Sequence, residues 1–244
     1  MVLPISVVIP AKNDAAMLDR CLLSLARQTL QPVEIIVVDN GSTDDTADVA
    51  RRHGVTVISE LRPGITAAAS RGYDEATGEI IARCDADSVL ARDWLARIAA
   101  TFERRPELGA VTGGAIFYDL PPVADWLARV LYLGGYFLSV GAAVANPPLF
   151  GSNFAMRRSL WQQLSASVPR DQPELHDDFD LSYRIPPDVQ VGYDRTLRVG
   201  ISGRPFRDSR AFRRRLRMAG TTLREHLPEQ LPHRRWRRRL LARR

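Results

Sequence analysis

The sequence predicts an α/β fold, with a Rossmann-like, mostly parallel sheet flanked by helices and a basic C-terminal helical tail. Three observations predict it. Short apolar runs rich in β-branched residues alternate with segments of helical periodicity through the first hundred residues. Polar residues follow several of these runs, and arginines concentrate near the C-terminus. With 244 residues, 45% of them hydrophobic and 25% charged, the chain has an ordinary globular balance.

The strands and helices expected in the first half alternate in order along the chain. Each expected strand is a compact apolar run, and each expected helix repeats apolar residues at a spacing of three or four. Strands that alternate with helices imply a parallel sheet with right-handed crossovers. The strands are expected over 5–10, 34–39, 55–59, 78–85 and 110–119, and the helices over 15–28, 41–54, 65–76 and 94–109.

The second half is less regular, and its clearest feature is an uncharged segment over 130–156. The densest apolar part, 130–145, is shorter than the roughly 20 residues that a membrane-spanning helix needs. It also contains three glycines. We therefore expect a buried helix, or one that lies on an interface, rather than a membrane span.

Charge divides the chain into two regions. From Arg204 to the C-terminus there are 15 arginines against three carboxylates, a net charge of +12, which leaves −6 for residues 1–203. We expect a catalytic domain over 1–204 and an arginine-rich helical tail over 205–244. The only cysteines are Cys21 and Cys84, and the N-terminus does not resemble a signal peptide. A reduced, cytoplasmic protein is therefore expected.

Two carboxylates end the fourth predicted strand, with one alanine between them. In an extended strand Asp85 and Asp87 would share a face, and like charges so close repel each other unless a cation lies between them. Polar residues at 12–14 and 39–40 also follow strands, and ligands of parallel sheets bind at that edge. The sequence favours a divalent cation there, and a solvated strand end is the alternative.

Five segments of the chain form a recognisable series of motifs: SVVIPAKND at 6–14, EIIVVDNGSTDDT at 34–46, DADS at 85–88, GSNFAMRRSLW at 151–161 and HDDFDLSYR at 176–184. Motifs in this order resemble those of the family 2 glycosyltransferases of GT-A fold. The family's processive polymerases carry a QxxRW motif, which this chain lacks, so the resemblance implies a non-processive, inverting transferase that adds a single sugar.

The resemblance implies a nucleotide-diphosphate sugar donor and a bound Mg²⁺ or Mn²⁺. Such an ion bridges the donor phosphates and stabilises the departing diphosphate. By resemblance, DAD corresponds to the family's DxD metal motif. Asp87 would bind the metal directly, and Asp85 would contact the donor ribose or the water shell of the metal.

The resemblance also implies further donor contacts. Asp39 would accept hydrogen bonds from the base or ribose, and Pro10, Lys12 and Asn13 would line the same pocket. Lys12 could equally be an ordinary exposed lysine, and Asp39 could cap the following helix. Arg71 stands two positions beyond the usual arginine of the family, so its donor contact and the nucleotide preference stay open.

The acceptor side and the base are implied by the last two motifs. Asp178 would remove the proton of the acceptor hydroxyl as general base, and Asp177 replaces the usual glutamate on the acceptor side. Gly151 would permit close backbone approach, and Asn153 would hydrogen-bond the acceptor or the donor sugar. His176 is an alternative metal ligand.

Three further residues and one segment are assigned with these motifs. Trp161 is expected to pack in the core rather than to stack on a sugar. Asp180 and Arg184 are expected to form an ion pair one helical turn apart. Residues 201–204 end the resemblance and are expected to close over the donor.

The arginine-rich tail mixes arginines with apolar residues at helical spacing, which suits a helix on an anionic membrane. We expect a protein peripheral to the inner face of the cell membrane, and an acceptor that is lipid-linked or a cell-envelope glycan precursor is the hypothesis that accompanies it. A solvated or disordered tail is the alternative.

Three other functions compete with a transferase. Arginine-rich ends also bind nucleic acid, but the body has acidic strand ends, so no nucleic acid partner is expected. A catalytically idle nucleotide-binding scaffold would not need both Asp87 and Asp178. A nucleotidyltransferase would show a glycine-rich loop after the first strand, and PAKND has no glycine. The sugar, the nucleotide, the acceptor, the linkage and the oligomeric state are not fixed by these motifs.

Overall fold

The computed structural model describes residues 3–242, so the outermost residues of the two predicted regions, 1–2 and 243–244, lie outside it. Its centre is a single sheet of eight strands. These are β1 (Ile5–Ala11), β2 (Glu34–Asp39), β3 (Thr56–Ser59), β4 (Ile80–Arg83), β5 (Val89–Leu90), β6 (Leu108–Phe117), β7 (Phe154–Arg157) and β8 (Gln190–Ile201).

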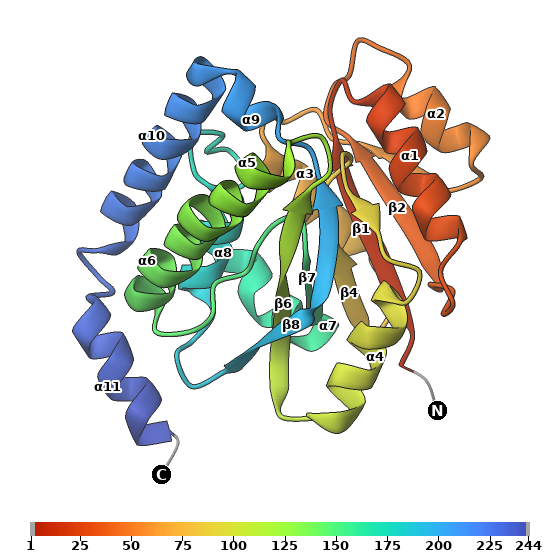
Figure 1. Ribbon diagram of the computed structural model, residues 1–244. Coiled ribbons are helices and arrows are strands. Elements are labelled where there is room, and N and C mark those ends of the chain that lie inside the picture. Colours follow the sequence, from red (N-terminus) through yellow and green to blue (C-terminus); the bar gives the residue numbers. More distant parts are fainter. Residues whose placement is uncertain (1–2, 243–244) are drawn as a thin grey trace.

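Helices cover both faces of this sheet (Figure 1). The helical segments are α1 (Ala15–Ala26), α2 (Thr46–Arg52), α3 (Ile65–Glu75), α4 (Trp94–Arg104), α5 (Pro122–Leu127), η1 (Ala128–Leu133), α6 (Gly134–Val144), α7 (Arg158–Leu164), η2 (Ser165–Ser167), α8 (Asp177–Arg184), α9 (Arg204–Arg207), α10 (Ser209–His226) and α11 (Pro232–Ala242).

The strand order is β3-β2-β1-β4-β7-β6-β8-β5. The N-terminal half is parallel, as the alternating pattern predicts, because β1 pairs with both β2 and β4, and β2 pairs with β3. The C-terminal half is mixed. Strand β7 runs antiparallel to β4 and β6, β5 runs antiparallel to β8, and β6 and β8 are parallel. The sheet is therefore buried on both faces in its centre, as apolar runs such as that of β1 require.

Two apolar layers form the core. On one face Leu18 of α1 and Trp94 of α4 are fully buried against the sheet. On the other face Tyr73 of α3 and Trp161 of α7 pack edge to face, with ring centroids 4.9 Å apart. The Trp161 indole N–H also donates to Asp74 at 3.0 Å. The expected core role of Trp161 is thus confirmed.

Helix α3 lies unusually close to the sheet at Gly72. A Cβ at this position would stand 2.4 Å from Val8 and 2.9 Å from Val38. A side chain at this position would force the two valines or the helix to shift. The small residues of the 65–76 segment therefore set the distance between α3 and the strands that carry the site.

The fourth strand is shorter than expected, and this changes the geometry of the two carboxylates that follow it. Strand β4 ends at Arg83 rather than at 85, and the next residues form a turn in which the Ser88 N–H donates to the Asp85 carbonyl at 3.0 Å. Asp85 and Asp87 therefore lie in a turn and not on one face of a strand. The prediction of a regular extended backbone here was wrong, because the Ser88 side chain also accepts the Asp85 N–H at 3.2 Å.

The uncharged segment continues a long helix that begins at α5 and runs through η1 to α6. Pro122–Val144 is long and apolar enough to cross a membrane, with a mean hydropathy of 1.5, but length and composition alone do not make it a span. Only 17% of its most apolar stretch is buried. Large apolar side chains on its outer face are Val123, Trp126, Leu127, Val130, Leu131 and Leu138.

The arginine-rich region folds back onto the body (Figure 1). The guanidinium of Arg235 on α11 is buried and donates to the carbonyls of Val144, Tyr183 and Ile185 at 2.7–2.9 Å. These contacts satisfy helix and loop carbonyls that would otherwise lack donors. Part of the basic charge therefore serves the fold, a role that composition does not indicate.

Candidate active site

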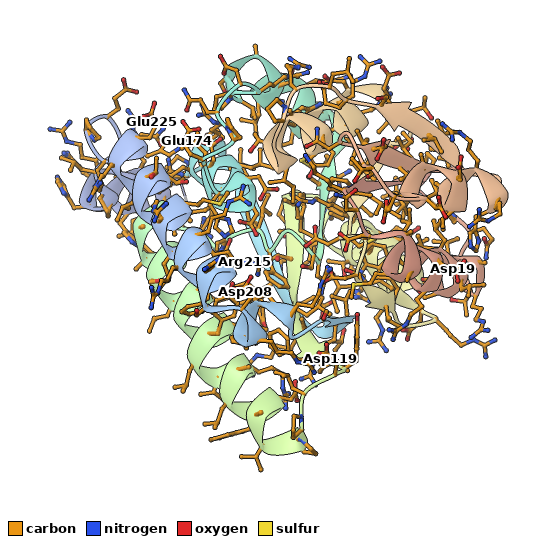
Figure 2. The ribbon with its side chains drawn as sticks, turned by 90° about the horizontal axis from the view of Figure 1, so that it is seen from above. Asp19, Asp119, Glu174, Asp208, Arg215 and Glu225 are labelled. Carbon is orange, nitrogen blue, oxygen red and sulfur yellow. The ribbon has the colours of Figure 1, made fainter. Side chains whose placement is uncertain are left out.

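A cleft of about 600 Å³ opens at the carboxyl ends of β1 and β4. Helix α10 closes one side of it through residues that include Arg215, which is labelled in Figure 2. The sequence-predicted site residues that line this cleft are Pro10, Lys12, Asp85, Asp87, Gly151, Asp177 and Asp178.

Arg83, the last residue of β4, is the central charge of the site. Its side chain is buried, and its guanidinium is paired with Asp177, donates to Asp85 at 3.1 Å and approaches the Tyr73 hydroxyl at 3.4 Å. Burial lowers the pKa of Arg83, but the carboxylates around it raise that pKa well above its usual value. Arg83 is not among the residues predicted from the sequence motifs. The signal was a charged side chain inside the apolar run that precedes the DxD motif.

Asp85 is fixed by neighbours on both of its oxygens. One oxygen accepts from Arg83, and the other accepts from the Ser152 hydroxyl at 2.6 Å. A carboxylate held in this way has little freedom to rearrange around a cation. Asp85 is therefore better suited to orient a bound ligand or a metal-bound water than to coordinate the metal ion directly.

Asp87 and Asp14 both contact the guanidinium of Arg204. Arg204 reaches across the cleft, with guanidinium nitrogens 2.7 Å from Asp14 Oδ1 and 3.3 Å from Asp87 Oδ2. Burial raises the pKa of Asp87 to about 6, Asp85 adds to this rise, and Arg204 opposes it. A carboxylate whose ionisation is this unfavourable gains from a bound cation. Arg204 ends the segment 201–204, and the closure of that segment over the donor stays a prediction.

Asp177 and Asp178 begin α8 and differ in environment. Burial raises the pKa of Asp177, with Arg83 opposing the rise. Burial also acts to raise the pKa of Asp178, but His176 and the Gly151 N–H, which donates at 2.7 Å, hold it below its usual value. Two adjacent carboxyls whose pKa values move in opposite directions are typical of sites that divide acid and base roles.

The cleft fits a divalent cation. His176, Asp177 and Asp178 offer ligand atoms that all lie within 4.8 Å of one another. Two of these buried atoms, His176 Nδ1 and Asp178 Oδ1, lie 2.6 Å apart but form no aligned hydrogen bond within the described part of the chain. Asp87 lines the same cleft and offers a carboxylate to Mg²⁺ or Mn²⁺, which prefer oxygen ligands, whereas Asp177 is already paired with Arg83.

Two predicted donor residues lie beside the cleft rather than in its wall. Asn13, in a left-handed conformation (φ 53°), accepts the Thr43 N–H at 2.7 Å. Asp39 accepts the Ser42 N–H at 3.2 Å, but α2 begins only at Thr46, so the alternative that Asp39 caps the following helix was wrong. Both side chains brace the loop after β2.

Two others lie further away. Arg71 is half exposed on α3 and pairs with Glu75 at 2.9 Å, one helical turn along. Asn153 is buried in the core, where it accepts the Trp94 indole N–H at 2.9 Å and donates to the Leu197 carbonyl at 2.9 Å. The expectation that Asn153 contacts a sugar does not agree with this position, because its amide already holds three elements together.

Comparison of the chain with known protein families agrees with this arrangement of the site. The family model for glycosyl transferase family 2 matches residues 6–164, more than half of the chain. The chain belongs to glycosyl transferase family 2. A relative from Mycobacterium bovis (strain BCG / Pasteur 1173P2), a PGL/p-HBAD biosynthesis glycosyltransferase, is 37% identical over 118 residues, which are 46% of each chain. The match thus spans about half the length of that curated relative.

Solved structures share the fold of this family 2 member. A mannosyltransferase from Pyrobaculum calidifontis, in complex with GDP-Man and Mn²⁺, superimposes with a TM-score of 0.75 at 24% identity, covering 100% of this chain and 69% of that one. Glucosyl-3-phosphoglycerate synthase from Mycobacterium tuberculosis, in complex with Mn²⁺, UDP and glucosyl-3-phosphoglycerate, gives 0.61 at 21% identity, covering 92% and 80%. The GT-A fold predicted from the motifs is therefore confirmed.

Proposed function

We propose that this chain is a metal-dependent, inverting glycosyltransferase that moves one sugar from a nucleotide-diphosphate donor to a hydroxyl acceptor. The observation that carries the proposal is the single cleft that places Asp87 and Asp178 together at the carboxyl ends of the parallel strands. One acid suits a cation, and the other is ionised and hydrogen-bonded as a base.

On the donor side, Asp87 would hold Mg²⁺ or Mn²⁺ at the diphosphate. A metal bound there neutralises the charge that builds up on the departing phosphate oxygens. The chain's own cations Lys12, Arg204 and Arg215 line the same cleft and would bind the remaining phosphate oxygens. Asp85, fixed by Arg83, would orient the ribose or a metal-bound water.

On the acceptor side, Asp178 would take the proton of the attacking hydroxyl. The Gly151 N–H and His176 keep this carboxylate ionised and oriented. Its neighbour Asp177 stays on Arg83 and would contact the acceptor from there. Attack on the face of the anomeric carbon opposite the departing diphosphate inverts the configuration, with the hydroxyl proton ending on Asp178.

The two neighbouring structures with GDP-Man or UDP support a nucleotide donor but do not select its base. Thermal-shift binding of UDP, GDP, dTDP and CDP, each with and without Mn²⁺, tests the donor site. We expect one nucleotide to stabilise the wild type only with metal, and Asp87→Ala to abolish the shift. Asp48→Ala, an exposed carboxylate on α2 that pairs with Arg51, is the matched control. No shift with any nucleotide would overturn the proposal.

A catalytically idle scaffold is the competing function. It would give the same metal-dependent shift, so binding does not exclude it. Hydrolysis or transfer of the selected nucleotide sugar by the wild type, lost in Asp178→Asn, would exclude it. Unchanged release of nucleotide in Asp178→Asn would instead show that Asp178 is not the base.

We further propose that the protein is cytoplasmic and binds the inner face of the membrane peripherally, where a lipid-linked acceptor or cell-envelope precursor would lie. Support comes from the exposed apolar face of Pro122–Val144 and from the exposed arginines of the nearby α10. Sedimentation with phosphatidylglycerol vesicles should weaken in Trp126→Ser/Leu131→Ser. Leu61→Ser, also highly exposed but remote from this helix, should not change it.

A further inference from the structure

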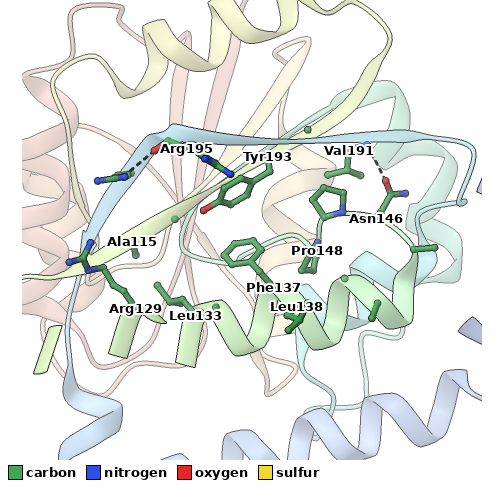
Figure 3. Close-up of a pocket in the computed structure, with 18 of the residues that line it drawn as sticks. Ala115, Arg129, Leu133, Phe137, Leu138, Asn146, Pro148, Val191, Tyr193 and Arg195 are labelled. Atoms are coloured by element: carbon green, nitrogen blue, oxygen red, sulfur yellow. Dashed lines mark hydrogen bonds between the residues drawn. The ribbon is translucent and has the colours of Figure 1, made fainter. Parts of the chain in front are cut away.

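A second cavity, of about 950 Å³, lies on the other side of the long apolar helix from the catalytic cleft. It opens between α6 and β8 (Figure 3), and Trp236 and Arg239 of α11 also line it. Leu133 lines both hollows, so the helix forms a common wall. The volume is within the range of small-molecule sites in proteins.

The walls of this cavity are largely apolar. Leu133 and Phe137 project from the helix toward Val191 and Tyr193 on β8, as Figure 3 shows. The Phe137 and Tyr193 rings meet edge to face with centroids 5.0 Å apart. Pro148 closes one end. These surfaces suit a hydrocarbon chain rather than a sugar, which would need many polar partners.

The charged residues of the lining are all of one sign. Among the described residues that line the cavity there are five arginines and no carboxylate. Arg129 pairs with the nearby Asp125 at 3.0 Å. Arg195 and Arg198 are exposed beside an irregularity within β8, where the Arg198 Nε–H donates to the Arg195 carbonyl at 3.0 Å, and both residues line the cavity. Their charges are not neutralised by a carboxylate in the lining.

The common wall also has an unusual backbone. Residues 128–133 form a π-helical turn inside the long helix, and this turn contributes Arg129 to the cavity and Tyr132 to the cleft. π-turns are rare and are found frequently at functional sites. Here the turn lies where the two hollows meet.

We propose that this cavity binds an anionic amphiphile, with a hydrocarbon chain between α6 and β8 and a phosphate-like head group at Arg195 and Arg198. An aliphatic chain matches the apolar walls, and a planar guanidinium pair matches a phosphate. The mouth lies beside Leu138, which is exposed on the apolar helix face. This binding site goes beyond the proposed transfer reaction and does not depend on it.

Isothermal titration with decyl phosphate, below its critical micelle concentration, tests the site. Inorganic phosphate tests the head group alone, and decyl maltoside tests the chain with a neutral head. We expect saturable binding of decyl phosphate only, with an affinity gain of up to about fourfold per buried methylene from octyl to decyl phosphate. Equal binding of decyl maltoside, or tight binding of inorganic phosphate alone, would overturn the proposal.

A pair of glycine variants tests where the hydrocarbon chain binds. Gly134 lines the cavity and Gly135 does not, and a Cβ meets nothing nearer than 3.6 Å at either position. Gly134→Leu should weaken decyl phosphate binding at least tenfold, and Gly135→Leu should leave it unchanged. Equal effects of the two leucines would contradict the assignment to this cavity.

For the charge, Arg195→Gln/Arg198→Gln should weaken binding at least tenfold. The matched control is Arg237→Gln/Arg238→Gln, which removes the same charge from exposed positions of α11 outside the lining. Metal-dependent nucleotide binding, retained in all four variants, would show that each is folded and would separate this test from that of the cleft. Equal losses in both arginine pairs would indicate unspecific attraction and overturn the proposal.

Two sources could supply such an amphiphile, a bilayer phospholipid or a prenyl phosphate. Native mass spectrometry after incubation with vesicles of phosphatidylcholine doped with phosphatidylglycerol or with a prenyl phosphate distinguishes them. Retention of either anionic lipid by the wild type, and not by Gly134→Leu, supports the site and names its source. Retention of phosphatidylcholine instead would overturn it.

Discussion

The two hollows that share the helix Pro122–Val144 differ in how they treat charge. In the cleft, buried carboxylates and arginines neutralise one another, as Arg83 does with Asp85 and Asp177. No described carboxylate lines the cavity, and although Arg105 and Arg129 pair with carboxylates outside its lining, Arg195 and Arg198 form no described salt bridge. The difference teaches that the arrangement of carboxylates around the arginines, rather than pocket size, separates a site for a cation and a diphosphate from a site for an anion.

The largest expected effect concerns the base in the cleft. Asp178→Asn should lower kcat about 10²–10⁴-fold, because the amide cannot accept the hydroxyl proton. Metal-dependent nucleotide binding should stay within a factor of two or so, since the base does not hold the donor. Steady-state kinetics with the donor selected by thermal shift measure this. A parallel loss of nucleotide binding would instead assign Asp178 to the donor side.

The next effect is on stability and concerns the buried ion pair of the cleft. Arg83→Met should lower the free energy of unfolding by about 3–5 kcal/mol, because it leaves the Asp177 carboxylate buried without its partner. Arg83→Met/Asp177→Asn should recover part of that loss. Urea unfolding measures both.

Arg97→Met is the matched control, since it breaks an exposed pair with Asp93 one helical turn away. A loss below about 1 kcal/mol is expected there. If the two arginine variants lose equal stability, the charges of the cleft are not specially buried.

A smaller effect depends on pH and concerns the contact between α8 and α10, the helix that lines one side of the cleft. Although burial alone would raise it, hydrogen bonds from His226 and Arg184 hold the pKa of Asp180 below its usual value. The ionised form therefore stabilises the fold at pH values above the unfolded pKa of about 3.9. This stabilisation is lost as the pH falls through the lower, folded pKa.

Asp180→Asn should therefore cost about 1.5–3 kcal/mol at pH 7, as expected for hydrogen bonds to a charged group. The cost should shrink on acidification below pH about 4. Urea unfolding at several pH values measures the difference between the variant and the wild type. A cost that does not depend on pH would contradict the role of the ionised carboxylate.

The smallest effect concerns the arginine that spans the cleft. Arg204→Ala should raise the affinity for Mn²⁺, without nucleotide, by a few-fold, because it removes a half-exposed cation that competes for Asp87. Electron paramagnetic resonance titration measures free Mn²⁺ directly. Arg207→Ala is the control, because it removes an arginine whose contacts, a hydrogen bond to the Asp119 carbonyl at 2.6 Å and a 3.8 Å approach to the Asp119 carboxylate, do not involve Asp87. A lower Mn²⁺ affinity in Arg204→Ala would show that this arginine assists the metal instead.

Much of the site could be predicted from the sequence because its residues directly follow apolar strands. The ends of β1 and β4 bring Lys12, Asp85 and Asp87 to one cleft, as the edge rule for parallel sheets requires. Asn153 could not be placed in this way. A motif match carries no information on burial, and the Asn153 amide faces the core, where Trp94 needs a partner.

The parts that could not be predicted depend on long-range packing. Arg83 could be noticed as a charge in an apolar strand, but its partner Asp177 is 94 residues away in sequence. The contacts of the arginine-rich region could not be predicted from the sequence either. Composition distinguishes an arginine-rich segment, but it does not show that Arg235 finds three carbonyls of the body while other arginines stay exposed.

The packing of α10 has a consequence for the order of events during synthesis. Chains fold from the N-terminus as they leave the ribosome, so the turn with Asp87 and the helix α8 with Asp178 emerge before α10. Yet α10 supplies Arg214, Arg215 and Met218 to the wall of the cleft. The acids of the site are thus made first and enclosed last, and a nascent chain that lacks α10 presents them to solvent without the wall that completes the cleft.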